Sequence, residues 1–434
     1  MSRRLSLPIF AASMLVISCL LICPRICHCQ TSRQLPQQTI LQGELNKILA
    51  VCYSKSGKEL AAVDSAGVLA IWDIGQRMLI GKIQLPYQMN EHAQLEWDAN
   101  GKILLCWSHD VGAFVIDRLL MKQKTIFSKS EELLQPHPYR YLSTQSLRIL
   151  PDGKSLLRVQ SAIFNVPDEV REVVAASSFL EVIDIEKKKV LKLDSPKYIM
   201  NIKYVKEGQF LATDWDASLY SGSVKDASQN MQVLRQTNKQ RQELYDNLTM
   251  IYRGLMGLSA DGKYLVVSGV SGEFKYDKSG NVKNSVTGVV DVFHLKPFRK
   301  LNTLSIAKID YEDQRISNLF SQLNTVCISP DGAYIAAGSL SGIVQIWDRQ
   351  QMQSLRVIKL KHEDTPRDIR FAPGDRPCFA FIAGDESVLY YCDLNKKQEF
   401  KLSGVETFDW SADGKQLAVA RKEEGAVLLF DLNE

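Results

Sequence analysis

One short phrase recurs eight times along the 434 residues, and it constrains the fold more than any other feature. It is a small polar turn that ends in glycine, followed by a basic or polar residue and an apolar run. Residues 259–263 and 411–415, both Ser-Ala-Asp-Gly-Lys, are its clearest copies. Asp-Gly and Asn-Gly are strong hairpin signals because both residues tolerate positive φ. The glycines of the eight copies are Gly57, Gly101, Gly153, Gly208, Gly262, Gly332, Gly374 and Gly414.

The spacing of these glycines predicts the architecture. Successive glycines are 44, 52, 55, 54, 70, 42 and 40 residues apart. A period of about 40–45 residues with strand–turn–strand content is typical of the blades of a β-propeller. The shortest spacings give the basic unit, and the longer ones add insertions to it. The sequence therefore predicts an all-β, eight-bladed propeller of four-stranded antiparallel blades, with a seven-bladed ring as the alternative.

A second feature follows each turn. The next strand but one ends in a bulky residue and usually an aspartate, most clearly at Trp72-Asp73 and Trp347-Asp348. Residues 219–221, Leu-Tyr-Ser, match this pattern least well, so the fourth unit is the least clearly marked.

These units resemble the WD40-repeat family, whose name comes from the Trp-Asp pair. The resemblance covers about residues 38–434 and is strongest over residues 323–358. It implies a propeller that binds a protein or peptide. The Gly-His dipeptide that opens many repeats of the family is missing throughout this sequence. We therefore expect these blades to depend mainly on apolar packing, without the buried His–Asp network of that family.

The two ends of the repeat region complement each other. The last unit stops just after its Trp-Asp-like strand and lacks a fourth strand, while residues 39–45 precede the first unit. This N-terminal segment is similar to residues 79–85, which we assign to an outer strand. We expect it to close the last blade, because closure removes exposed sheet edges. Residues 38–434 would then form a single propeller, preceded by a linker over residues 30–37.

The first 29 residues have the layout of a secretory signal. A basic start at Arg3 and Arg4 precedes an apolar run over residues 7–23, and Pro24 breaks this run. Polar sequence begins at Gln30, which predicts a secreted or periplasmic protein that is cleaved there. The apolar run of 17 residues is close to the minimum for crossing a bilayer, so an uncleaved membrane anchor is one alternative. The other alternative is a lipid on Cys19, since residues 16–19 resemble a bacterial lipobox.

Five cysteines follow this segment: Cys52, Cys106, Cys327, Cys378 and Cys392. Their odd number and their spacing match no disulfide framework and no zinc site. Cys52 and Cys327 occupy equivalent positions in two units, which indicates core packing. Cys378 and Cys392 flank one hairpin and leave a cross-strand disulfide open, although strand pairs rarely have suitable geometry.

The longest insertions indicate where a partner would bind. In a propeller, the loop between the second and third strands of a blade opens on the same rim as the connection between blades, here called the top rim. Residues 164–176, 269–288 and 308–322 map to this rim, while the rim of residues 225–252 is not determined by the sequence. Aromatic and arginine side chains on such loops are common binding hot spots, although insertions without a partner are also well tolerated. The candidate partner-binding residues are Phe164, Arg171, Phe274, Tyr276, Tyr311, Arg315 and Phe320.

Motifs for catalysis or cofactors are absent from the sequence. It contains no His-Glu-x-x-His, no Gly-x-Ser-x-Gly and no phosphate-binding glycine loop, and its histidines are not at metal spacing. We therefore expect a non-enzymatic, monomeric scaffold without cofactor or metal; a propeller enzyme with a site at the channel mouth is the alternative. The formal charge falls from +4 to +1 without residues 1–29, which gives no basis for nucleic-acid binding. Membrane contact is expected only through the N-terminal segment.

Overall fold

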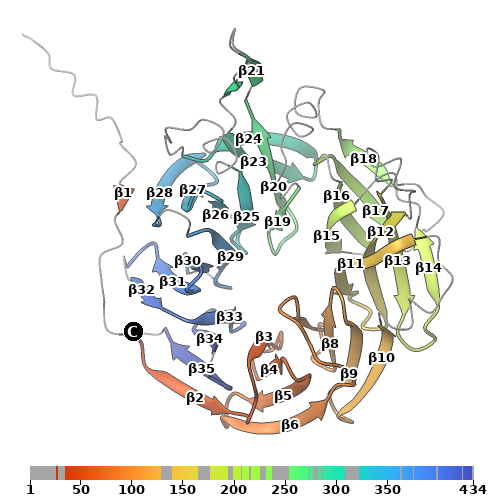
Figure 1. Cartoon of the computed structure of the whole chain (residues 1–434). Helices are drawn as coiled ribbons and strands as arrows, with labels where there is room; N and C mark the ends of the chain where they lie inside the picture. Colours follow the sequence, from red (N-terminus) through yellow and green to blue (C-terminus); the bar gives the residue numbers. More distant parts are fainter. Residues whose placement is uncertain are drawn as a thin grey trace, which may run out of the picture.

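The computed structural model shows a ring of eight four-stranded antiparallel sheets around a central opening (Figure 1). It describes residues 26–27, 35–128, 139–164, 176–193, 199–206, 208–214, 217–224, 231–236, 254–272, 274–276, 282–284, 287–307, 322–361, 364–374, 376–396, 399–422 and 424–432. Within these ranges there is no helix with the length and apolar character needed to span a membrane. The predicted eight-bladed propeller is confirmed.

The first four blades follow the chain in order, with the first strand innermost. Blade 1 contains β3 (Ile48–Tyr53), β4 (Glu59–Asp64), β5 (Val68–Asp73) and β6 (Met78–Gln84). Blade 2 contains β7 (Gln94–Trp97), β8 (Ile103–Ser108), β9 (Gly112–Asp117) and β10 (Lys122–Ser128). Blade 3 contains β11 (Tyr139–Ile149), β12 (Ser155–Phe164), β13 (Ala176–Asp184) and β14 (Val190–Leu193). Blade 4 contains β15 (Ile199–Lys206), β16 (Gln209–Asp214), β17 (Leu219–Ser223) and β18 (Gln232–Arg235).

The remaining blades carry two additions. Blade 5 contains β19 (Met256–Leu258), β20 (Tyr264–Ser271), β23 (Thr287–Leu295) and β24 (Phe298–Ser305), with the small hairpin β21 (Phe274–Tyr276) and β22 (Val282–Asn284) between β20 and β23. Blade 6 contains β25 (Leu323–Ile328), β26 (Tyr334–Ser339), β27 (Ile343–Asp348) and β28 (Gln353–Lys359), and β1 (Ile26–Cys27) pairs with β28. Blade 7 contains β29 (Pro366–Phe371), β30 (Cys378–Ala383), β31 (Val388–Asp393) and β32 (Glu399–Leu402). Blade 8 contains β33 (Val405–Trp410), β34 (Gln416–Arg421), β35 (Ala426–Asp431) and β2 (Gln38–Gln42).

The recurring phrase forms the turn between the first two strands of a blade. In blade 5, the Ser259 hydroxyl accepts the backbone N–H of Tyr264 at 2.9 Å and donates to Asp261 at 2.7 Å. Gly262 completes the turn at a φ of +68°, where a side chain would be strained. Ser329 and Ser411 begin the same turn in blades 6 and 8. The phrase therefore fixes the hairpin that places the inner strand of a blade against the channel.

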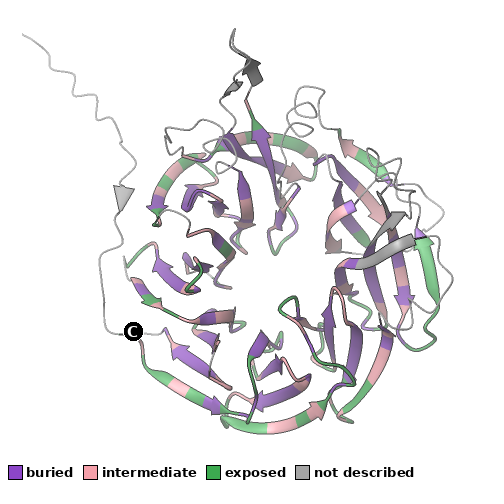
Figure 2. Cartoon of the chain, viewed as in Figure 1, coloured by how far each residue is buried: buried purple, intermediate pink, exposed green. Residues whose placement is uncertain are grey.

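Apolar packing between neighbouring blades fills the ring. The described residues form eight clusters of buried side chains, and each cluster joins the facing sheets of two adjacent blades. Figure 2 shows burial concentrated in the middle strands and exposure along the outer strands. The expected reliance on apolar packing is consistent with this arrangement, since removing apolar surface from water is the main favourable term in folding.

Buried aspartates in these blades find partners other than histidine. Asp64 is fully buried and accepts two backbone N–H groups of its own loop region, from Asn46 at 2.8 Å and Val68 at 2.7 Å. Asp291 is also fully buried and forms ion pairs with Arg235 at 2.5 Å and Lys300 at 2.7 Å. Each carboxylate is thus satisfied locally or by a cation, as a buried charge requires.

The N-terminal strand closes the ring, as the sequence predicts. β2 pairs antiparallel with β35 along all five of its residues. Leu41 is 1% exposed and packs between blades 8 and 1, whereas the adjacent Ile40 is 52% exposed. The indole N–H of Trp72 in blade 1 donates to the carbonyl oxygen of Gln42 at 2.9 Å. The first blade is therefore bonded directly to the strand that completes the last one.

Two uncertain points of the sequence are settled by the strand pairing. The weakly marked segment at residues 219–221 begins β17, where Leu219 and Tyr220 are buried, so the fourth unit is a full blade. Cys378 and Cys392 are free and out of register, because Cys378 lies opposite Asp393. They pack on opposite faces of their sheet, in the clusters on either side of blade 7. The disulfide that the sequence left open is therefore not formed.

Replacing Leu41 with alanine should lower the free energy of unfolding by about 2–5 kcal/mol, because it leaves a cavity between blades 8 and 1. Ile40→Ala on the same strand is the control, and its exposed side chain should change stability by about 0.5 kcal/mol or less. Urea denaturation followed by tryptophan fluorescence measures both. Equal effects of the two substitutions would show that β2 does not pack into the ring.

Candidate functional site

A cavity of about 710 Å³ lies at the centre of the ring. Its walls come from the innermost strands of all eight blades, which surround the opening in Figure 1. Charged side chains of both signs line this cavity, together with apolar residues and two cysteines. It is therefore a polar channel that every blade helps to build.

Eight equivalent positions encircle this channel, and we call them the channel ring. Each lies two residues before the first residue of the turn between the first two strands of its blade. The repeat therefore places all eight at the same height along the channel. The members of the channel ring, in order, are Cys52, Glu96, Arg148, Lys203, Gly257, Cys327, Arg370 and Asp409. Seven of them line the cavity, and Glu96 contacts Arg148 of the next blade at 3.8 Å. No catalytic or metal-binding motif contains these residues, although their constant distance from the turn marks them in the sequence.

The two acidic members of the channel ring bind the backbone of the following blade. Asp409 of blade 8 accepts the N–H of Tyr53 in blade 1 at 2.8 Å. Glu96 of blade 2 accepts the N–H of Ile149 in blade 3 at 3.3 Å. Both carboxylates thus link neighbouring blades at the channel wall.

Arg370 holds two carboxylates at this level. It donates to both oxygens of Asp368, at 2.8 and 2.9 Å, and to Asp409 at 3.1 Å. Asp368 adopts a φ of +56° at an irregularity in β29, which aims its side chain back at Arg370. Burial raises the pKa of Asp409, and the guanidinium of Arg370 and the N–H of Tyr53 act against this rise. Arg370 is therefore the main counter-charge for Asp409.

The thiols of the channel ring are poor nucleophiles. Burial raises the pKa of Cys52 and of Cys327 far above the ordinary value, so both thiols stay protonated near neutral pH. A thiolate is the reactive form of cysteine. Within the described part of the chain, no group of three His, Cys, Asp or Glu side chains is arranged to hold a metal ion.

The predicted partner-binding residues lie beside long connections, but their side chains are not described. Phe164 ends β12, and Phe274 and Tyr276 lie in β21. The other four candidates, Arg171, Tyr311, Arg315 and Phe320, lie outside the described residues. The structure therefore places three of the seven in strands, and their role in partner binding stays a prediction.

The strand bounds show that long connections occur on one rim. The opposite rim, here called the bottom rim, carries the connections from the first to the second strand and from the third to the fourth strand of each blade. These connections are two to eight residues long. On the top rim, four connections exceed ten residues: 165–175, 236–255, 272–286 and 306–322. The segment whose rim the sequence did not determine, residues 225–252, contains β18, and its longer part joins blades 4 and 5 at the top. All four long connections belong to blades 3–6.

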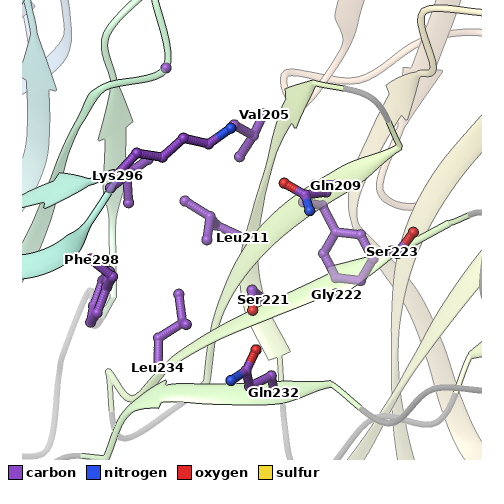
Figure 3. A pocket seen from close by; sticks show the side chains of 13 residues that line it. Val205, Gln209, Leu211, Ser221, Gly222, Ser223, Gln232, Leu234, Lys296 and Phe298 are labelled. Carbon is purple, nitrogen blue, oxygen red and sulfur yellow. The ribbon is translucent and has the colours of Figure 1, made fainter.

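A second, smaller pocket of about 270 Å³ lies between blades 4 and 5 (Figure 3). Val205, Leu211, Leu234 and Phe298 form its apolar wall, and Figure 3 shows the side chain of Lys296 extending across it toward Val205. Lys296 belongs to the turn between β23 and β24, which lies on the bottom rim. This pocket is therefore on the rim opposite to the long connections.

Comparison with known proteins identifies one blade directly. The family model described as WD domain, G-beta repeat, matches residues 316–348, which include β25, β26 and β27 of blade 6. No curated protein matches the chain. The matched segment includes the Trp347-Asp348 pair at the end of β27.

Replacing Arg370 with methionine should lower the free energy of unfolding at neutral pH by about 1–3 kcal/mol, because charge-assisted hydrogen bonds to two carboxylates are lost. Without the guanidinium, the pKa of Asp409 rises further. The deficit should therefore shrink as the pH falls through that raised pKa and the carboxyl becomes neutral. Urea denaturation over a pH series measures this.

The matched control for this prediction is the double variant Arg370→Met with Asp409→Asn. Its deficit at neutral pH should be smaller than that of Arg370→Met alone, because no unpaired carboxylate remains at position 409. A deficit that is independent of pH in both variants would contradict the role assigned to Arg370.

Proposed function

Starting from a β-propeller of the WD40-repeat family, we propose that this protein is a non-enzymatic scaffold that binds a protein or peptide partner on its top rim. WD40 propellers generally act as scaffolds for protein interactions. The proposed binding surface is the part of the top rim over blades 3–6, where the long connections lie.

The one-sided distribution of long connections carries the proposal. Insertions that are merely tolerated have no reason to avoid one rim, because surface loops accept added length at little free-energy cost. Here the bottom rim has no connection longer than eight residues, whereas the top rim has four longer than ten. Added length on one rim of a rigid ring is typical of loops that bind a partner.

The chemistry of the channel supports binding over catalysis. Each acidic member of the channel ring accepts a backbone N–H from the next blade, so both carboxylates contribute to structure. The ring thiols, Cys52 and Cys327, stay protonated near neutral pH. A catalytic nucleophile needs a base within hydrogen-bond reach, whereas the thiol of Cys52 donates to the backbone carbonyl oxygen of Tyr53 at 3.5 Å.

Shortening the longest insertion within a blade should abolish partner capture. Residues 272–286 are replaced by Asn-Gly, which joins Ser271 of β20 to Thr287 of β23 as a two-residue hairpin. The altered protein is expected to lose, by about tenfold or more, a partner that the unaltered protein captures from its host, in line with removal of hot spots worth about 2 kcal/mol. Circular dichroism and thermal unfolding confirm that the ring remains folded.

The matched control shortens a connection on the other rim. Residues 225–230, in the longest connection of the bottom rim, are also replaced by Asn-Gly. This variant should capture the partner as well as the unaltered protein does. Unchanged capture by the top-rim variant, or equal loss in both variants, would overturn the top-rim proposal.

We also propose that the chain is exported and that residues 1–29 are removed. The support is the basic start at Arg3 and Arg4, the apolar run that follows and the polar sequence from Gln30. Expression in a host with a secretory pathway, followed by intact mass and N-terminal sequencing of the exported form, should give a protein that begins at Gln30. A protein that keeps Met1 and stays with the cells would contradict cleavage.

A further inference from the structure

One cation of the channel ring differs from the other two. Arg370 has Asp409 as its neighbour in the ring, and Arg148 has Glu96. Lys203, from β15 of blade 4, stands between Arg148 and Gly257, so neither neighbour offers it a carboxylate. Among the described residues, Lys203 forms no salt bridge and no hydrogen bond through its side chain. Buried charges in proteins are normally paired, which makes this lysine an exception that needs an explanation.

The strands that face Lys203 explain its electrostatic state. The charged and titratable groups that act on it from other blades are Glu96, Arg148, Cys327 and Arg370, with Asp368 and Asp409 bound to Arg370 beyond them. Both nearby acids of the ring already accept hydrogen bonds from the backbone of the next blade. Cys327 is a protonated thiol and carries no charge near neutral pH. Burial and the positive charges of Arg148 and Arg370 therefore lower the pKa of Lys203, and the negative charge of Glu96 opposes them only in part.

Burial together with the positive charges of Arg148 and Arg370 lowers the pKa of Lys203 to about 8. Near neutral pH the amine is still mostly protonated, although burial and the neighbouring positive charges destabilise this charged form. An anion placed beside the amine would reduce this electrostatic penalty. Because Lys203 lies only partly exposed at the channel wall, the anion would have to come from the channel.

Arg148 has hydrogen-bond donors left for such an anion. Its distance of 3.8 Å from Glu96 is longer than the roughly 2.8 Å of a charge-assisted hydrogen bond. Its side chain is 35% exposed and lines the same cavity as Lys203. A planar guanidinium with free donors is well suited to a carboxylate or a phosphate, and an ammonium adds a compact second charge.

The channel has room for the anion. Its volume of about 710 Å³ far exceeds the roughly 30 Å³ that one water molecule occupies in the liquid, so an oxyanion fits together with ordered water. Gly257, next to Lys203 in the ring, has no side chain, and this leaves the channel open on that side of the lysine. The same position cannot gain a side chain easily, since an added Cβ would lie 3.0 Å from the backbone of Cys327.

We propose that the central channel binds a small oxyanion, a carboxylate or a phosphate, between Lys203 and Arg148. The anion is either a free solute or an acidic side chain that a partner inserts into the channel. The proposal rests on the channel ring alone and does not depend on binding at the top rim.

Isothermal titration of the mature protein with sodium sulfate tests the site, because the charge of sulfate is constant over the relevant pH range. We expect binding at pH 7, a loss of at least tenfold in Lys203→Met, and recovery of most of the affinity in Lys203→Arg, which keeps the charge. The matched control is Lys102→Met, which removes an exposed lysine of a bottom turn outside the channel. Equal affinity in Lys203→Met and Lys102→Met would overturn the proposal.

The pH dependence separates a binding role from a structural one. Sulfate requires the protonated amine, so its affinity should be constant below about pH 8 and then fall by up to about tenfold per pH unit. The affinity of Lys203→Arg should not change over the same range, since arginine remains charged. A sulfate affinity that varies with pH in the same way in the arginine variant would contradict the assignment to Lys203.

A stability measurement without any anion checks the unpaired charge independently. Folding lowers the pKa of Lys203 from the ordinary 10.5 to about 8, so the folded protein is penalised below pH 8, where the amine is charged in both states. Lys203→Met should therefore unfold at higher urea than the unaltered protein at pH 7. This gain should disappear as the pH rises from 8 to 10.5. A destabilised variant at pH 7 would show that the charge already has a partner.

Two further ligands distinguish the sources of the anion. Titrations with inorganic phosphate and acetate test free solutes, and a blocked peptide with one glutamate, compared with its glutamine counterpart, tests an inserted side chain. Binding of the solutes with the dependence on Lys203 supports a free anion, and preference for the glutamate peptide supports a partner's side chain. Failure of all these ligands to bind at about 10 mM, a concentration that detects interactions of about 3 kcal/mol, would overturn the proposal.

Discussion

Five residues at the beginning of the propeller, Gln38–Gln42, pair with β35 at its end, and this contact turns a row of sheets into a ring. Most contacts between blades join sequence neighbours, whereas this pairing, like the packing of β3 against β33 and the bond from Tyr53 to Asp409, joins the two ends of the propeller. Leu41 and Trp72 consolidate it, through apolar packing and through the bond from the indole to the carbonyl oxygen of Gln42. Once the ring is closed, the eight inner strands face one another at fixed distances, and a residue of one repeat acquires a definite partner in the next.

The channel ring follows from that closure. An acid at this position can reach the backbone N–H of the next blade, as Asp409 does at the seam between blades 8 and 1. A cation at the same position needs a carboxylate in the preceding or following blade, and Arg370 has one in Asp409. Lys203 has none, because blade 5 supplies a glycine there. The site proposed for an anion is thus a consequence of which residue types the repeats place side by side.

Much of this architecture could be predicted from the sequence, because residues close together in each repeat determine its hairpins. The Ser-x-Asp-Gly turns at Ser259 and Ser411 are stabilised by hydrogen bonds between their own residues, so the sequence of the turn alone predicts the hairpin. Blade 4 was marked poorly because β17 lacks the bulky residue and aspartate of the pattern, yet it forms since Leu219 is buried against its neighbours. The channel ring was also accessible, by counting two residues back from each turn. The arrangement of the long connections could not be predicted, because their sequences have no periodicity that relates one residue to another.

Blades 4 and 5 contribute to both of the surfaces proposed to bind. The connection over residues 236–255 leaves blade 4 at the top rim and leads directly into β19, which carries Gly257 of the channel ring. Lys203 lies four residues below the top end of β15, about 13 Å along an extended strand. An extended acidic segment held at the top rim would therefore need only about four residues to bring a carboxylate to the lysine. A free anion needs no such segment and would occupy the channel whether or not a partner is present. The geometry thus connects the two proposals only when the anion belongs to the partner, and their separate tests decide whether it does.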